Sequence, residues 1–320
     1  MTLLPWQGQT MPLMLAPMQG LTNRAMRAVQ CEIGQPDVIF TEFVRVSHVA
    51  RKRIAPSDRR EIQASYGGVP LVVQLIGHRP ESLAEAARIV ADLGGVHVNL
   101  NMGCPFGRTT TGKTGGAMLQ EPERIEESLR AVRAVFQGSL SVKVRAGYHD
   151  PEQIFDLLPV FEDCGVDFLV LHPRTVVQKY TGQADHDITA RVVAATALPV
   201  IANGDLFTAE YARRVAVETG AAGLMLGRGA ISDPWLFERI RHGGDPGDLV
   251  EQLRQMSFYF SRLSEGYSEL FCGEQQVLCK VKNVLEAFVD PDMQPLVKKL
   301  RRTKQLAQFH AVLRDAAQAD

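Results

Sequence analysis

Residues able to do chemistry stand at the ends of short apolar runs in this chain. The most reactive is Cys104, in the loop Asn101-Met102-Gly103-Cys104-Pro105. A cysteine thiol is mostly protonated at neutral pH, so it could donate a proton as a general acid or act as a nucleophile. Lys143 lies inside the apolar run 140–145 (LSVKVR). A lysine there is costly unless it reaches solvent, an anion or an electron-rich ring.

Other polar residues occupy equivalent places along the chain. The full set is Pro17, Gln19, Glu42, Gln74, Asn99, Asn101, Cys104, Lys143, Arg145, His172, Arg174, Asn203, Asp205 and Arg228. Any single one could be a turn or capping residue. Because unpartnered buried polar groups are costly, a polar group at nearly every run end indicates one shared site.

Eight such runs must position these residues. They are rich in β-branched residues and mostly apolar throughout, which is typical of parallel strands covered on both faces. They span residues 13–18, 38–43, 71–77, 96–101, 140–145, 168–174, 198–204 and 223–229, each followed by a helical pattern. This count predicts a (β/α)8 TIM barrel, whose chemistry lies at the carboxyl ends of the strands. An open doubly wound sheet is the alternative, but no GxGxxG follows the first run.

The end of the barrel pattern provides a second signal. Asn203-Gly204-Asp205 and Gly227-Arg228-Gly229 end runs seven and eight, where this fold usually binds phosphate. Helices are predicted at 81–93, 121–136, 151–164 and 209–219, the last capped by Thr208 and ended by Gly220. Beyond about residue 245 only helical patterns occur, at 249–263, 277–288 and 296–313. We therefore expect a barrel domain over 1–243 and an all-helical domain over 244–320.

Composition excludes several classes of protein. The 320 residues are 45% hydrophobic and 22% charged, unlike a disordered, collagen-like or coiled-coil chain. Five cysteines without a CxxC pair indicate reduced thiols rather than disulfides or a zinc site, and no metal site is expected. We expect Cys31, Cys164, Cys272 and Cys279 in the core. With no signal peptide and no apolar stretch of ~20 residues, we expect a cytoplasmic protein without a membrane segment.

The motifs, taken together, resemble a known family. In chain order they are LAPMQGLTN, TEFVRV, VQLIGH, NLNMGCP, GGAML, VKVRAG, LHPRTVVQKYTGQADH, PVIANGD and LMLGRGA. They resemble the tRNA-dihydrouridine synthase family, flavoenzymes that reduce uridines in tRNA with NADPH, over about residues 11–240. TEFVRV resembles the bacterial subgroup acting on U16. The resemblance implies an FMN-binding barrel, a helical tRNA-binding domain, NADPH or NADH as reductant, tRNA as partner and a monomer.

The resemblance also implies roles for individual residues. Those expected at FMN are Pro17, Met18, Gln74, Lys143, His172, Asn203, Asp205, Gly227 and Arg228. Cys104 would protonate C5 of uracil while a hydride reaches C6. Those expected at the RNA substrate are Glu42, Asn101, Arg145 and Arg174, with Asn101 holding the uracil and Arg174 facing the RNA. Asn99 departs from the aspartate common in the family, and the loop 106–114 departs from its lysine-rich form.

Three other functions remain open from the residues. One is another FMN-dependent TIM-barrel oxidoreductase acting on a small pyrimidine or enone, such as a dihydroorotate dehydrogenase or an enoate reductase. Another is an aldolase or isomerase using Lys143 as a Schiff-base nucleophile. The third is a tRNA-binding module without catalysis.

Charge is unevenly distributed although the formal net charge is -1. The average argues against a nucleic-acid partner. One basic run comprises Arg45, Arg51, Lys52, Arg53, Arg59 and Arg60, and the other comprises Lys280, Lys282, Lys298, Lys299, Arg301, Arg302 and Lys304. We interpret these two runs as opposite walls of a tRNA groove that binds phosphates.

Overall fold

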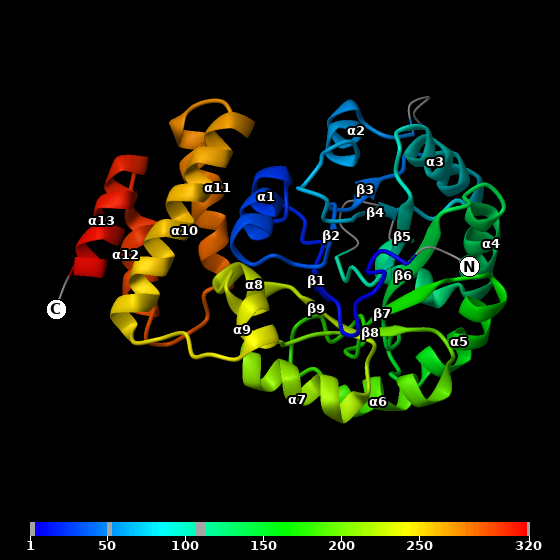
Figure 1. Cartoon of the computed structure of the whole chain (residues 1–320). Helices are drawn as coiled ribbons and strands as arrows, with labels where there is room; N and C mark the ends of the chain where they lie inside the picture. The colour runs from blue at the N-terminus through cyan, green and yellow to red at the C-terminus, as the bar shows by residue number, and fades with distance from the viewer. Residues whose placement is uncertain (1–3, 50–52, 107–112, 319–320) are drawn as a thin grey trace.

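A closed barrel of parallel strands forms the larger part of the molecule (Figure 1). The structure is a computed structural model that describes residues 4–49, 53–106 and 113–318. The order is β2-β1-β9-β8-β7-β6-β5-β4, and pairing of β2 with β4 closes the barrel. The bounds are β1 Leu13–Leu15, β2 Val38–Phe40, β4 Leu71–Ile76, β5 His97–Met102, β6 Ser139–Arg145, β7 Phe168–His172, β8 Val200–Asn203 and β9 Gly223–Leu226. The TIM-barrel prediction is confirmed, and closure excludes the open sheet.

Each of the eight predicted runs overlaps one barrel strand, and burial explains why. The strands β1, β2 and β9 are buried at every position, as apolar runs enclosed by helices require. One further strand, β3 (Val44–Arg45), has only two residues and pairs with the end of β4 beyond β2. The sequence did not predict β3 as a separate strand, because it follows immediately after the second apolar run in the chain.

Helices surround the barrel. Their bounds are α1 Arg24–Ile33, α2 Pro56–Ile62, α3 Pro80–Asp92, η2 Gly115–Gln120, α4 Pro122–Arg133, α5 Gln153–Asp163, α6 His186–Ala195, α7 Ala209–Thr219, α8 Arg228–Ser232 and α9 Leu236–His242. The Thr208 hydroxyl accepts a hydrogen bond from the Tyr211 N–H at the start of α7. Gly220 ends the same helix with φ 64°. Both predicted caps of this helix are therefore confirmed.

The C-terminal part is helical, as expected. It comprises α10 Leu249–Leu270, α11 Glu274–Val284, η3 Leu285–Ala287, α12 Gln294–Arg302 and α13 Leu306–Gln318. The prediction of one helix over 296–313 is wrong, because the chain turns at Thr303, which has extended backbone. The ammonium group of Lys282 donates to the Thr303 carbonyl, and the Thr303 hydroxyl donates to Leu300. These bonds satisfy polar groups exposed by the break.

The C-terminal helices share a hydrophobic core with α1 of the barrel. Met26 and Val29 on α1 pack in the same cluster as Tyr259 and Phe260 on α10. Figure 1 shows α10–α13 standing beside α1, away from α4 and α5. The boundary predicted at 243–244 stays a prediction, because the core is continuous across it. Among the described residues, no helix is long and apolar enough to cross a membrane.

Candidate functional site

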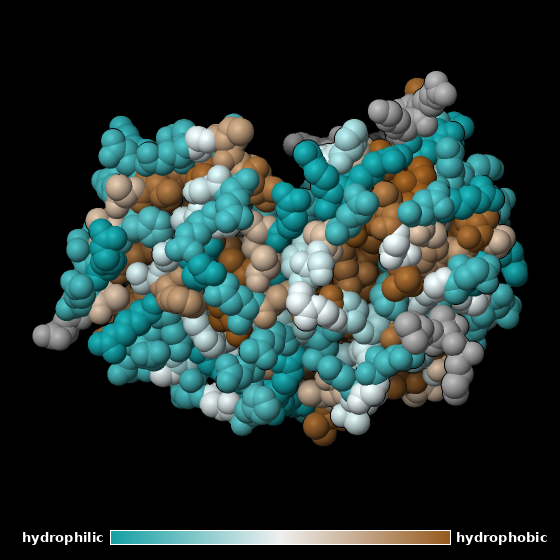
Figure 2. Space-filling model, turned by 45° about the horizontal axis from the view of Figure 1, so that its top comes forward, coloured by the Kyte–Doolittle hydropathy of each residue, from teal (hydrophilic) through white to brown (hydrophobic). Residues whose placement is uncertain are grey.

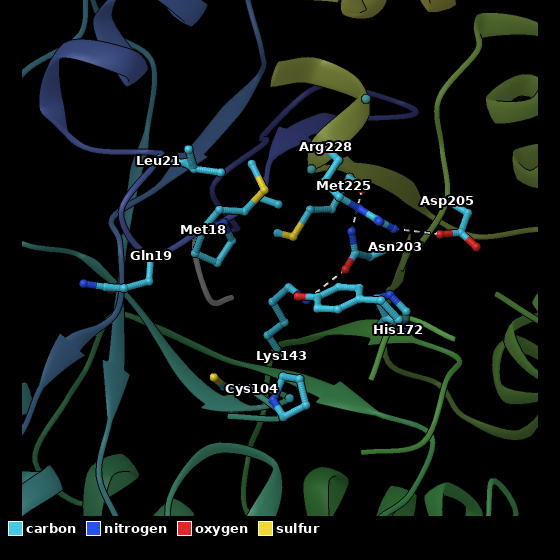
Figure 3. Close-up of a pocket in the computed structure, with 18 of the residues that line it drawn as sticks. Met18, Gln19, Leu21, Cys104, Lys143, His172, Asn203, Asp205, Met225 and Arg228 are labelled. Atoms are coloured by element: carbon cyan, nitrogen blue, oxygen red, sulfur yellow. Dashed lines mark hydrogen bonds and ion pairs between the residues drawn. The ribbon is translucent and has the colours of Figure 1, made fainter. Parts of the chain in front are cut away.

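A cavity of about 440 Å³ opens at the carboxyl ends of the strands. Most of the predicted site residues line it, and Figure 3 shows Met18, Lys143 and Asn203 close together in it, with Gln19 pointing away. Those lining it are Pro17, Met18, Gln19, Asn101, Cys104, Lys143, Arg145, His172, Asn203, Asp205, Gly227 and Arg228. Gln74, Glu42 and Arg174 do not line it. The cavity is within the size range of small-molecule sites.

Lys143 projects from β6 toward the end of β8. Its Nζ donates to Oδ1 of Asn203 at 2.8 Å, and Nδ2 of Asn203 donates to the Met225 carbonyl at 2.8 Å. Burial, together with the smaller effect of the nearby Arg145 cation, lowers the pKa of Lys143 to about 7. The lysine can therefore be cationic or neutral near neutral pH.

His172 ends β7 as a neutral ring. Burial lowers the pKa of His172 well below its usual value, as do the cations of Lys143, Arg145 and Arg174. Its Nδ1 lies 3.3 Å from the Arg174 backbone N–H and accepts its hydrogen bond. The ring proton is consequently assigned to Nε2. His172 can thus donate one hydrogen bond without carrying charge.

Asp205 occupies a strained turn at the end of β8. Its φ is 52°, directly after Gly204 with φ 127°. The carboxylate accepts from Arg174 at 3.0 and 2.5 Å, from Arg228 at 3.0 Å and from the Ala184 N–H at 2.9 Å. Burial opposes ionisation, but these hydrogen bonds and the two guanidinium charges leave the pKa of Asp205 lowered. Because the turn and these hydrogen bonds hold Asp205 in place, its carboxylate fixes the position of the Arg228 side chain.

The two arginines expected at the RNA make hydrogen bonds within the protein. The Arg174 side chain is 2% exposed and donates to Asp205 and to the carbonyls of Thr181 and Gly182. It does not face solvent, and its expected contact with RNA stays a prediction. Arg145 lines the cavity, but its Nε donates to the Gly103 carbonyl at 2.9 Å. Its Nη1 donates to the carbonyls of Thr175 and Lys179, at 2.9 and 2.7 Å. Arg145 therefore joins the loops after β5 and β7.

The backbone of Cys104 is held on both sides. Oδ1 of Asn101 accepts its N–H at 3.0 Å, and its carbonyl accepts the Gly116 N–H at 2.9 Å. A Cβ on Gly115 would lie 3.0 Å from the Cys104 Cβ, and one on Gly116 would lie 3.0 Å from the Cys104 oxygen. The close approach of this segment to the Cys104 backbone therefore requires glycine at both positions. The sequence analysis assigns these glycines no role, although two adjacent glycines indicate a place where the backbone approaches another segment closely.

Gln74 lies beneath the cavity rather than in its wall. It is fully buried, and its Oε1 accepts a hydrogen bond from Nδ2 of Asn101 at 2.8 Å. Direct contact with a ligand in the cavity, as expected for Gln74, therefore has no support from the lining of the cavity. Asn101 is 8% exposed, with its oxygen and its nitrogen both bonded within the protein.

Aromatic side chains that the sequence did not single out surround the mouth. Phe106 and Tyr180 are 55% and 49% exposed, with ring centroids 6.2 Å apart. The Arg228 guanidinium carbon lies 5.0 Å from the Tyr180 centroid, and Nζ of Lys179 lies 5.9 Å from that of Phe106. The mouth thus combines exposed rings with cations.

Glu42 lies outside the cavity, near the C-terminal helices. Its Oε1 is buried without a hydrogen-bond partner among the described residues. Burial raises the pKa of Glu42 to about 7, although the charges of Arg27 and Lys280 oppose this rise. The expected contact of Glu42 with the RNA stays a prediction.

The remaining cysteines differ from the expectation that all lie in the core. Cys164 is buried, whereas Cys272 and Cys279 are exposed, so the expectation is wrong for those two. Cys272 lies in the bend before α11, and Cys279 lies on the exposed face of that helix. Burial raises the pKa of Cys31 to about 12, which makes that thiol unreactive. In the described ranges, no cluster of three or more His, Cys, Asp or Glu side chains could hold a metal.

The closed barrel and the convergent site at its carboxyl rim define a barrel enzyme of the (β/α)8 class. A family model described as dihydrouridine synthase matches residues 14–316. The chain belongs to the dihydrouridine synthase family.

Individual relatives agree with this assignment. A probable tRNA-dihydrouridine synthase of Rhodobacter capsulatus is 34% identical, over 95% of this chain and 94% of that protein. A tRNA-dihydrouridine(16) synthase of Cupriavidus necator is 38% identical, over 78% of this chain and 81% of that protein. A tRNA-dihydrouridine synthase B of Vibrio cholerae is 35% identical, over 75% and 74%.

A solved structure supports the fold alone. Histamine dehydrogenase from Rhizobium sp. 4-9 superimposes with a TM-score of 0.58 at 14% identity. The match covers 72% of this chain and 46% of that one.

Proposed function

We propose that this protein reduces uridine in tRNA to 5,6-dihydrouridine, with FMN as its flavin and NADPH or NADH as reductant. The observation that carries the proposal is that Cys104 shares one cavity with Lys143, in a chain of the dihydrouridine synthase family. Position 16 is the proposed uridine, because TEFVRV resembles that subgroup and a relative named for that position is 38% identical. We propose a monomer acting in the cytoplasm, where the free thiols described above stay reduced.

The residues present suit FMN. Ala16, Met18 and Met225 supply apolar wall, while Lys143 and Arg228 supply positive charge. A Cβ on Gly227 would lie 3.5 Å from the Met18 sulfur, which is ordinary van der Waals contact, so this part of the wall is not crowded. When bound, FMN supplies the hydride for C6 of uracil.

Individual side chains would hold the flavin by complementary chemistry. Lys143 and Asn203 would bind the polar edge of its ring system, where negative charge develops on reduction. His172 and Arg228 would bind its phosphate, as a neutral donor and as a cation. Pro17 and Met18 would cover the ring, and Asp205 would act through Arg228.

Cys104 is the proposed general acid. Its thiol lines the cavity on a loop whose backbone is held by Asn101 and Gly116. The proton on its sulfur would pass to C5 of uracil, quenching the charge that appears there. A protonated thiol achieves this without a metal ion.

The entrance of the cavity suits a nucleobase that is flipped out of the RNA base stack. The exposed rings of Phe106 and Tyr180 can contact a nucleobase, and Lys179 can contact a phosphate. Arg145 would support this mouth through the Lys179 carbonyl. Asn101 would contact the uracil with the second N–H of its Nδ2, since the first donates to Gln74.

The predicted groove walls need revision at two residues. Lys282 donates to Thr303, and Arg53 pairs with Glu85 at 2.6 Å, so both are bonded within the protein. Arg51 and Lys52 lie outside the described residues. The exposed cations on and after α12 are Lys298, Lys299, Arg301, Arg302 and Lys304, of which Arg301 also donates to the Leu285 carbonyl at 3.4 Å. These remain proposed phosphate contacts. In Figure 2 a notch separates the two lobes of the surface.

Two measurements test the proposal. Mass spectrometry of tRNA from cells lacking the protein should show unmodified uridine at one position, and purified protein should restore dihydrouridine there. The purified protein should be yellow, and unmodified tRNA should reoxidise its reduced flavin. A colourless protein that takes up no FMN contradicts the flavin proposal. Reoxidation by orotate or an enone but not by tRNA favours the other FMN barrels.

A further inference from the structure

A chain of buried polar side chains runs under the cavity from the Cys104 loop to β6. Nδ2 of Asn101 donates to Gln74 at 2.8 Å, and Nε2 of Gln74 donates to Oδ1 of Asn99 at 2.8 Å. Nδ2 of Asn99 donates to the Ser141 hydroxyl at 2.9 Å. That hydroxyl donates to the Val98 carbonyl at 3.3 Å. We call Asn101, Gln74, Asn99 and Ser141 the amide chain.

The register of the sheet places these residues side by side. Gln74 pairs with Asn99 between β4 and β5, and Asn99 pairs with Ser141 between β5 and β6. All three residues are fully buried. Because no solvent reaches them, each side chain needs its neighbour as a partner, and the set orders as a unit.

Every hydrogen bond in the amide chain points the same way. Donation begins at the N–H groups of Gly103 and Cys104, both accepted by Oδ1 of Asn101. The Asn101 nitrogen must then find an acceptor, which only the Gln74 oxygen provides in the described structure. This bond fixes the orientation of the Gln74 amide. In that orientation Nε2 of Gln74 faces Asn99, and Oδ1 of Asn99 accepts its hydrogen bond. Reversing one amide would bring two donors or two acceptors together.

We infer that Asn99 is a positioning residue, which fixes the Asn101–Cys104 loop through Gln74 without touching the ligand cavity. The inference rests on the proposed function, since it concerns how the proposed proton donor is placed. It also shows that an aspartate, common in the family, is compatible with the same role at this position. An aspartate would accept from Gln74 equally well and would accept from Ser141 instead of donating to it.

The test uses flavin-loaded full-length protein with three substitutions. Asn99→Leu removes the acceptor for Gln74, whereas Asn99→Asp keeps it. Ser141→Ala leaves Nδ2 of Asn99 without its acceptor. Ser128→Ala is the matched control, because the buried Ser128 hydroxyl has no partner in the described residues and its loss orphans nothing.

Two readouts distinguish positioning from a general loss of stability. We expect Asn99→Leu to slow flavin reoxidation by tRNA about tenfold, equivalent to ~1.4 kcal/mol, with flavin reduction by NADPH nearly unchanged. Asn99→Asp should recover most of this loss, and Ser141→Ala should fall between them. Alkylation of Cys104 by iodoacetamide, followed by peptide mass spectrometry, should change in rate for Asn99→Leu but not for Ser128→Ala.

Several results would overturn the inference. They are wild-type reoxidation and alkylation in Asn99→Leu, equal losses in both half-reactions together with a lower Tm, or no recovery in Asn99→Asp. The proposed function fails separately, if wild-type protein does not transfer its electrons to tRNA. The alkylation rates would still report on the amide chain in that case, with Cys279 as an exposed internal reference.

Discussion

At the scale of residues, Cys104 is defined by what holds its backbone rather than by a partner for its sulfur. Its N–H donates to Oδ1 of Asn101, and its carbonyl accepts the N–H of Gly116. No histidine base is hydrogen-bonded to the sulfur in the described structure, where its contact is the Phe106 carbonyl at 4.0 Å. An acid that only gives up its own proton needs position more than activation, which fits this arrangement.

Replacing Cys104 tests that role. Cys104→Ala should keep the fold and the flavin but slow reoxidation by tRNA by ~10²–10⁴-fold, as loss of general-acid catalysis does. Stopped-flow absorbance of the flavin measures it. Cys279→Ala, at an exposed position on α11, is the control and should behave as wild type. Near-normal dihydrouridine formation by Cys104→Ala would refute the acid role.

Lys143 should make stability depend on pH. Its pKa is about 7 in the folded protein against 10.5 as the ordinary value, so between those values the unfolded chain binds the additional proton. Unfolding free energy of the flavin-free protein should therefore rise with pH across that window, and level off above it. Urea unfolding of Lys143→Met should show a smaller rise. Identical pH profiles for both proteins would show that burial does not perturb this lysine.

At the scale of elements, η2 acts as the support of the Cys104 loop. It begins with Gly115-Gly116 directly against the Cys104 peptide, and Val176 from the loop after β7 packs on the same spot. The loops after β5 and β7 therefore meet at these glycines. Arg145 joins the same two loops through the carbonyls of Gly103 and Thr175.

Adding one methyl group at Gly116 should disturb this junction. A Cβ there would lie 2.6 Å from Val176 Cγ2 and 3.0 Å from the Cys104 oxygen, so neighbours must move. We expect Gly116→Ala to lose activity with tRNA while keeping flavin and most of its Tm. The double variant Gly116→Ala/Val176→Ala should recover part of the activity. Full activity in the single variant would exclude a tight contact.

At the scale of the whole molecule, near-zero net charge conceals a basic surface on the C-terminal helices. Lys298, Lys299, Arg301 and Arg302 project from α12, whose buried residues are Val297 and Leu300. An exposed group of cations on one helix can bind phosphates without altering the average charge.

Neutralising α12 should weaken tRNA binding in a salt-dependent manner. Changing Lys298, Lys299, Arg301 and Arg302 to Gln should lower affinity, and lower the slope of log K against log salt by ~0.7–0.9 per lost phosphate contact. Filter binding at several salt concentrations measures both quantities. Arg130→Gln/Arg191→Gln, at exposed positions on α4 and α6, is the control. An unchanged slope would remove α12 from the interface.

Truncation tests whether the molecule divides at residue 243. Removing 244–320 would uncover the face of α1 formed by Met26 and Val29, which packs with α10. We expect the shortened chain to aggregate or to unfold at a lower Tm than the full protein, because an apolar surface becomes exposed. Light scattering and thermal unfolding measure this. A stable monomer with the full-length Tm would establish independent domains.

The sequence alone determined the barrel, the strand ends and most of the cavity wall. Apolar runs alternating with helices specify parallel strands, and parallel strands bring their polar ends to one rim whatever the details of packing. Cys104, Lys143 and Asn203 could therefore be assigned to one site before any contact was known.

Only the tertiary structure decided which polar residues line the site and which support it. Arg174 and Gln74 occupy strand ends like their neighbours, yet ion pairing with Asp205 and burial under Asn101 keep them out of the cavity. Phe106 and Tyr180 come from loops with no periodic signal, and their meeting depends on how two distant loops pack. Side-chain pairing across strands depends on contacts between residues far apart in the chain, and a linear pattern does not contain those contacts.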